Sequence, residues 1–198
     1  MNIEPKIKQS KELIEWLDKN INGIEIADEN RQRLSVGCLD VALEHQKGII
    51  VLIENNVIGS ALSLVRVIFE SYIRGVWLNQ CATDKELKLF VKDKLEKSFA
   101  ILVSEIESKE TFNAGILSNA RKSGWGAMNS YTHSGIQQIV RRNTETSITP
   151  NYSEGEIVEA INFTNAIALL SAIEICNISN HIKLANELLE KVKEIASV

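Results

Sequence analysis

The chain has 198 residues, 44% of them hydrophobic and 24% charged, and carries a formal net charge of -4. This balance is ordinary for a globular protein, excludes a general nucleic-acid binder, and leads us to expect that residues 1–198 form a single domain. The three cysteines are isolated and odd in number, which excludes a disulfide framework and suits a reducing cytoplasm.

The spacing of apolar residues predicts one helix after another along the first half of the chain. Only two prolines and ten glycines occur in the whole sequence, so few positions interrupt such helices. The expected helices are Pro5–Asn20, Asp28–Asn55 with Asp28 as its N-cap, Ile58–Ala82, and Lys85–Ser108, which Thr83 or Asp84 caps.

The second half of the chain is less regular in its spacing. The expected elements are a short helix near Ala114–Arg121, a glycine-containing break at Ser123–Gly126, a helix at Asn129–Arg142, a loop at Thr144–Gly155, an apolar helix at Glu156–Ser179 and an amphipathic helix at His181–Ala196. The whole pattern predicts an all-α fold, a single up-and-down helical bundle with an irregular, glycine-containing excursion in its second half.

The segment Val57–Leu78 is long and apolar enough to raise the question of a membrane span. It carries three charges near its centre, and each would cost about 2.5–3.5 kcal/mol to insert into a bilayer. The N-terminal segment Met1–Leu17 is charged and has no continuous apolar signal region. We therefore expect a cytoplasmic protein that does not enter a membrane.

The three charges of that segment lie at four-residue intervals, at Arg66, Glu70 and Arg74. On a helix they share one narrow face, while the rest of the helix is almost wholly apolar. Glu70 can reach both arginines, so one interpretation is a solvated salt ladder on the face that meets water. The other is the floor of a cleft, in which two guanidinium groups bind a phosphate or a carboxylate.

A second candidate is the segment Asn129–Gly135, NSYTHSG, in which His133 is flanked by polar residues. The surrounding window, residues 111–144, contains four Lys or Arg residues and no Asp or Glu. Histidine suits general acid or base chemistry near neutral pH, while a structural histidine in a window that is basic by chance is the alternative. The candidate catalytic residues are His133, Arg66 and Glu70, and the candidate ligand-binding residues are Arg74, Tyr131, Gln137 and Arg141.

We expect Arg66, Arg74 and His133 to face a common cleft, with guanidinium groups within about 12 Å of the imidazole, so that one phosphate-sized ligand can bridge them. The cysteines and histidines lack metal-ligand spacing, and no phosphate-binding or dinucleotide-binding glycine motif occurs. Neither a metal nor a cofactor is expected.

The segment Arg66–Leu78, RVIFESYIRGVWL, is followed by ATDKEL and, further along, by NSYTHSGIQQIVRR. Together these resemble a family of uncharacterised bacterial helical proteins that pair R-x-x-F-E-x-x-x-R-G-x-W-L with N-S-Y-T-H-x-G. More distantly, that family is similar to the HEPN helical bundles, many of which are RNA-cleaving toxins or abortive-infection proteins that act as dimers. The HEPN motif, an Arg closely followed by a His on one helix, is absent, since the nearest Arg before His133 is Arg121.

The resemblance implies two functions. The first is a binding or partner module of a toxin–antitoxin or phage-defence system, a homodimer or one bound to a partner protein, with a cleft for RNA, a nucleotide or phosphate. The alternative is a metal-independent endoribonuclease, in which His133 is the acid or base and Arg66 and Arg74 stabilise the phosphorane charge.

Overall fold

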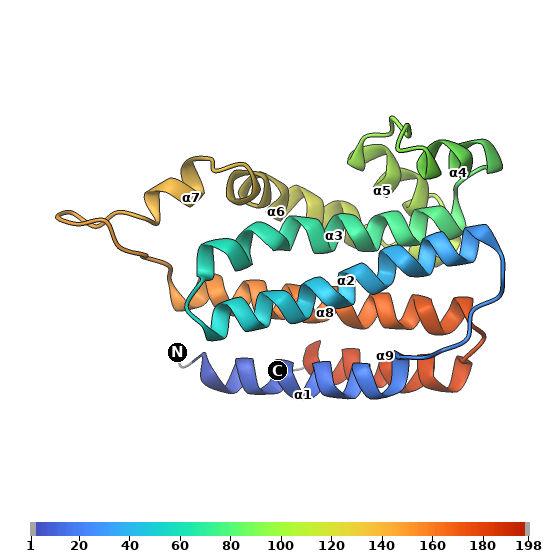
Figure 1. Ribbon diagram of the computed structural model, residues 1–198, viewed down its shortest axis with the longest axis horizontal. Helices are drawn as coiled ribbons and strands as arrows, with labels where there is room; N and C mark the ends of the chain where they lie inside the picture. Colours follow the sequence, from blue (N-terminus) through green and yellow to red (C-terminus); the bar gives the residue numbers. More distant parts are fainter. Residues whose placement is uncertain (1–2, 197–198) are drawn as a thin grey trace.

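The computed structural model describes residues 3–196, and within this range most of the chain is helical (Figure 1). The helices are α1 (Glu4–Ile21), α2 (Asn30–Glu54), α3 (Ile58–Gln80), α4 (Asp84–Val91), α5 (Phe99–Glu107), the 3-10 turn η1 (Glu110–Phe112), α6 (Ile116–Thr132), α7 (Ile136–Val140), α8 (Glu154–Ile178) and α9 (Ile182–Ala196). The predicted all-α bundle is confirmed.

Three long helices form the centre of the bundle. α2, α3 and α8 pack against one another, α1 and α9 cover α8 on one side, and α5 and α6 cover α3 on the other (Figure 1). Burial of a large apolar side chain contributes about 1.5–3 kcal/mol, so this core holds α3 firmly in place. The largest fully buried side chains include Leu39, Ile49, Ile68, Phe69, Ile73, Trp77, Ile161 and Leu169.

The single helix predicted at Lys85–Ser108 is wrong, because the chain forms two helices there. α4 ends just before Asp93, which adopts the left-handed conformation with a φ of 53°. α5 begins after Ser98, whose hydroxyl accepts a hydrogen bond from the amide of Ile101. The interruption allows α5 to turn back and pack against α3.

The two predicted N-caps have different outcomes. Thr83 caps α4, and its hydroxyl and amide exchange hydrogen bonds with Glu86 in a capping box, as expected from an N-cap threonine followed by glutamate. Asp28 does not cap α2, whose N-cap is Glu29. Asp28 instead forms an ion pair with Arg33, at 2.9 Å.

The glycine break predicted at Ser123–Gly126 is also wrong, because α6 continues through it and the chain turns directly after His133. The turn brings the backbone very close to the preceding helix. A Cβ at Gly135 would lie 2.5 Å from the hydroxyl oxygen of Ser130 and 3.0 Å from its Cα, so only glycine fits there. The helix predicted at Asn129–Arg142 is therefore divided between α6 and α7.

The loop predicted at Thr144–Gly155 ends earlier, since α8 begins directly after Ser153. Residues 141–153 project from the body of the bundle, with an isolated bridge between Asn143 and Ile148 (Figure 1). The hydroxyl of Ser153 accepts a hydrogen bond from the amide of Glu156, at 3.2 Å, and the Glu156 carboxylate accepts one from the Ser153 amide, at 3.1 Å. This capping box fixes the start of α8.

Replacing Ser153 by alanine is expected to lower the free energy of unfolding by about 1 kcal/mol, because the first turn of α8 loses its cap. Urea unfolding followed by circular dichroism measures the change. Ser60→Ala, at an exposed position on α3, is the control and should stay within about 0.5 kcal/mol of the parent. Equal stability of the two variants would argue against the cap.

Among residues 3–196, one helix, α8, is long and apolar enough to cross a membrane, whereas the segment considered above on sequence grounds lies in α3. Buried positions make up 67% of the most apolar window of α8. This burial is typical of the core helix of a soluble protein.

Candidate functional site

A cleft of about 330 Å³ lies where α3, α5 and α6 meet, and the charged stripe of α3 forms one of its walls. α6 closes the opposite side, and the start of α5 lies between them. We call this the basic cleft, and it is lined by Arg66, Glu70, Arg74, Lys97, Ser98, Phe99, Ala100, Leu102, Arg121 and Trp125.

The Arg66 side chain is held from several directions. Its Nε donates to Oε1 of Glu70 at 2.9 Å, and its Nη2 lies 2.8 Å from the same oxygen. The guanidinium carbon lies 5.0 Å from the centre of the Trp125 ring, which stacks on Phe99 at 4.2 Å. With the Arg66 and Glu70 side chains only 20% and 22% exposed, the guanidinium is fixed before any ligand arrives.

His133 contacts the same guanidinium group. Nη1 of Arg66 is in hydrogen-bond contact with Nε2 of His133, which lies at the C-terminal end of α6 and is exposed. An arginine can only donate, so Nε2 is the acceptor and the ring proton is on Nδ1. The expected proximity is therefore confirmed for Arg66 and His133, but His133 does not line the basic cleft, and the common cleft of all three residues stays a prediction.

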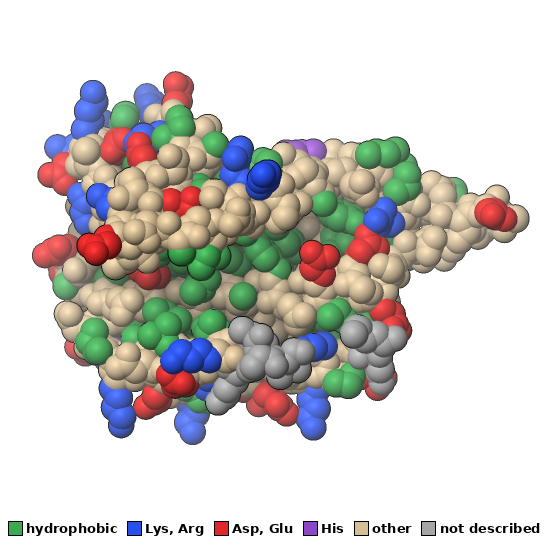
Figure 2. Space-filling view, turned by 180° about the vertical axis from the view of Figure 1, so that it is seen from behind, with side chains coloured by type: hydrophobic (Ala, Val, Ile, Leu, Met, Phe, Trp, Pro, Cys, Tyr) green, Lys and Arg blue, Asp and Glu red, His purple; other side chains and the backbone are tan. Residues whose placement is uncertain are grey.

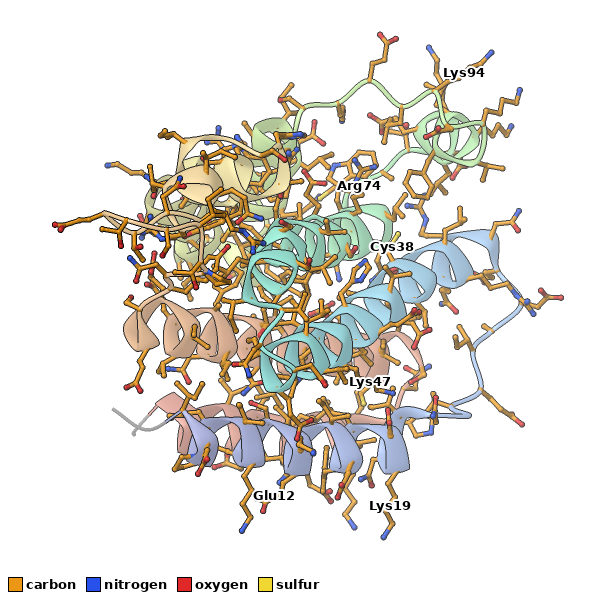
Figure 3. The ribbon with its side chains drawn as sticks, turned by 60° about the vertical axis from the view of Figure 1, so that its left-hand side comes forward. Glu12, Lys19, Cys38, Lys47, Arg74 and Lys94 are labelled. Carbon is orange, nitrogen blue, oxygen red and sulfur yellow. The ribbon has the colours of Figure 1, made fainter. Side chains whose placement is uncertain are left out.

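The cleft contains more positive charge than its acids balance. Arg66 pairs with Glu70, and Lys97 pairs with two carboxylates of α4 and α5. Among the described residues no ion pair is made by Arg74 or Arg121. The Nε of Arg121 is buried without a hydrogen-bond partner, and Figure 3 shows Arg74 on the side of α3 that faces α4 and α5.

The other predicted ligand-binding residues lie elsewhere. Tyr131, Gln137 and Arg141 line a separate groove between α3, α6 and α8. Arg141 forms an ion pair with Glu156, and the hydroxyl of Tyr131 donates to Oε1 of the same glutamate at 3.2 Å. The one site expected from the sequence is thus two, on either side of α6.

Glu156 is the partner that binds the predicted residues of this second groove. Burial acts to raise its pKa, but hydrogen bonds from Arg141 and Ser153 outweigh burial and bring the pKa to about 2. Burial and the nearby Glu156 charge raise the pKa of Tyr131 to about 12. The Glu156 carboxylate is therefore ionised at neutral pH and neutralises Arg141.

Several residues that line these sites were not predicted from the sequence, among them Arg121, Trp125 and Glu156. Arg121 belongs to the acid-free window but was assigned to a separate short helix, and Trp125 was placed in a break. Glu156 lies outside that window, in a helix that the periodicity does not connect to it. In the continuous helix α6, Arg121 and Trp125 lie one helical turn apart, on one face.

No group of three or more potential metal-ligating His, Cys, Asp or Glu side chains comes together in the described part of the chain. No curated protein and no solved structure matches the chain significantly. Residues 39–198 match the model of a family described as "Family of unknown function (DUF6988)", and both grooves lie within this range. Because the match covers more than half of the chain, the protein belongs to this family of unknown function.

Proposed function

We propose that the protein is a cytoplasmic, HEPN-like binding module that holds a phosphate-containing anion, such as a nucleotide or RNA, in the basic cleft. It acts as a homodimer or with a partner protein, in a bacterial toxin–antitoxin or phage-defence system. The observation that supports the proposal is the fixed guanidinium of Arg66, in contact with His133, beside the unpaired Arg74 and Arg121.

The reason that an anion suits this cleft is electrostatic. A buried guanidinium nitrogen without a partner is costly, and an anion in the cleft supplies the missing acceptor for Arg121. A phosphate offers several oxygens to the forked donors of the arginines. The first turn of α5, at Phe99 and Ala100, lies at the same cleft and adds the favourable end of its dipole.

Binding is tested by calorimetric titration with inorganic phosphate, pyrophosphate, ATP and a short single-stranded RNA. We expect Arg121→Gln and Arg74→Gln each to weaken binding about tenfold, because each removes a charged hydrogen-bond donor. Lys122→Gln is the matched control, since Lys122 is exposed on α6 beside Arg121 and does not line the cleft. Equal weakening by Lys122→Gln, or no binding of any of these anions, would contradict the proposal.

A metal-independent ribonuclease is the second candidate, and the contact between His133 and Arg66 favours it. A substrate phosphate would take the place of His133 on the guanidinium. Nε2 would then accept the ribose 2′-OH proton as O2′ attacks phosphorus, the P–O5′ bond breaks and water protonates O5′. Arg66 and Arg74 would bind the phosphorane oxygens.

The two candidates are separated by incubating the RNA with the protein in the presence of EDTA. Cleavage that leaves 2′,3′-cyclic phosphate ends, and that His133→Gln abolishes while RNA binding persists, supports the ribonuclease. RNA that binds and stays intact refutes it and leaves the binding module. Light scattering of the purified protein tests the homodimer, which should have twice the mass of one chain.

A further inference from the structure

A further groove, also lined by residues of α3, lies on the other side of α6 from the basic cleft. α6 and α8 both pack against α3, and between them a groove of about 410 Å³ remains open to solvent. Figure 2 shows it as a hollowed band of hydrophobic side chains across the middle of the face opposite that of Figure 1. We call it the apolar groove.

The walls of the apolar groove suit the body of a small organic molecule. Its floor consists of Leu62 and Val65 from α3, and its sides include Met128 from α6 and Phe163 from α8. Small-molecule sites typically occupy about 300–1,000 Å³ and are mostly apolar with a few polar groups. The apolar groove has this size and this composition.

The charge of a suitable ligand can be inferred from the charged side chains at the polar end of the groove, which are Arg141, Glu156 and Glu159. Arg141 directs both its Nε and one terminal nitrogen at Glu156, so its charge is already neutralised. Glu156 also accepts hydrogen bonds from Tyr131 and Ser153, which leaves it little capacity for a ligand. Glu159, one turn further along α8, lines the groove, is exposed and forms no ion pair among the described residues.

The uncompensated charge of the groove is therefore negative, although three of its residues were expected to bind an anion. A ligand anion would meet Glu159 and would have to displace Glu156 from Arg141. A ligand cation meets the Glu159 carboxylate and the aromatic side chains of Tyr131 and Phe163, which also attract cations.

We propose that the apolar groove binds a small organic cation, an apolar body that carries a protonated amine, with the ammonium group at Glu159. This site is separate from the basic cleft and does not depend on the function proposed for that cleft. The two sites differ in charge and lie on opposite sides of α6.

Binding is measured by ligand-detected NMR and calorimetry on the full chain, with phenylbutylamine, phenylbutanol and phenylbutyrate as probes. The three share one apolar body and differ in charge. We expect the amine to bind about fivefold more tightly than the alcohol and the acid to bind most weakly, because the partly exposed carboxylate acts on the charged group alone.

Two substitutions locate the site. Glu159→Gln should bring the amine and the alcohol to equal affinity, whereas Glu187→Gln, at an exposed position on α9, should change nothing. Ala127→Leu adds bulk at an exposed wall of the groove and should weaken all three probes, whereas Asn119→Leu, outside the groove on the same helix, should not.

Several results overturn the proposal. Equal affinity for the amine and the acid would show that the Glu159 carboxylate does not contribute to binding. Unchanged amine binding in Ala127→Leu, with a native far-UV spectrum, places the site elsewhere. No binding of any probe at about 10 mM means that the groove is not a small-molecule site.

Discussion

Gly75→Ala is expected to lower the free energy of unfolding by about 2 kcal/mol, although alanine is the better helix former. α2 and α3 are in close contact where the backbone oxygen of Gly75 accepts a hydrogen bond from the hydroxyl of Ser35, at 2.7 Å. An added Cβ would lie 2.6 Å from Cγ of Leu39 and 3.1 Å from the backbone oxygen of Ser35. Leu39 is fully buried and cannot move aside, so overpacking of about 3 kcal/mol exceeds the gain of about 1 kcal/mol in helix propensity.

Gly37→Ala is the matched control for this prediction. Gly37 lies in α2, and a Cβ added there meets nothing within 4 Å. We expect this variant to be more stable than the parent by about 1 kcal/mol, through helix propensity alone. Guanidinium unfolding should separate the two variants by about 3 kcal/mol, and equal stabilities would show that α2 and α3 do not need a glycine at their contact.

Glu174→Gln is expected to make the protein more stable at pH 8 and to change little at pH 4. Glu174 lies in α8 and is 8% exposed, and burial raises the pKa of its carboxyl group from the ordinary 4.5 to about 7. The folded protein therefore holds this proton more tightly than the unfolded chain does. The contribution of the protonated Glu174 carboxyl group to the free energy of unfolding is complete below pH 4.5. It is lost as the pH rises through about 7.

The expected size of this effect is about 3 kcal/mol at most, from the difference between the two pKa values. The neutral amide of glutamine avoids the burial of a charge, so the variant should lose the pH dependence that Glu174 causes. The nearby hydroxyl of Tyr72 keeps its proton throughout, because burial, and then the Glu174 charge, raise its pKa.

Urea unfolding of the parent and the variant across pH 4–8 measures the difference, in which the titration of other groups cancels. Glu187→Gln, at an exposed position on α9, is the control and should show a flat difference. A variant that is less stable than the parent at pH 8 would mean that the Glu174 carboxylate is stabilised by a positive partner, contrary to its raised pKa.

The residues of α3 have two roles: the apolar residues pack in the core, and the charged residues line the basic cleft. Phe69, Gly75, Trp77 and Leu78 hold α3 in the core, and Gly75 permits the close approach of α2. The charged positions face the basic cleft, where Arg66 is fixed by its neighbours. Of the salt ladder expected from sequence only the pair of Arg66 and Glu70 forms, since Arg74 makes no ion pair among the described residues, and this pair is part of the wall of the basic cleft.

The predictions that failed did so where local sequence signals compete with packing. Glycines favour a break at Ser123–Gly126, at about 1 kcal/mol each, but contacts of α6 with α3 outweigh them. The hydroxyl of Ser63 donates to the backbone oxygen of Tyr131 at 2.9 Å, and that of Thr132 to the backbone oxygen of Ser63 at 3.1 Å. These long-range hydrogen bonds hold the end of α6 on α3, and the spacing of apolar residues along the sequence does not reveal them.

The sequence by itself determined the all-α class, most helix positions, and the narrow charged face of α3, because these depend on residues three or four apart. Only the tertiary structure decided that Arg66 meets His133, that Arg121 lines the basic cleft with Arg66, and that Arg141 belongs to another groove. The reason is that the turn after His133 redirects the following residues to the far side of α6, and one glycine in a crowded turn sets that direction. The pair of Arg66 and Glu70 is local to α3, whereas Glu156 takes its partners Arg141 and Tyr131 from the chain before the loop that precedes α8, which the periodicity does not reveal.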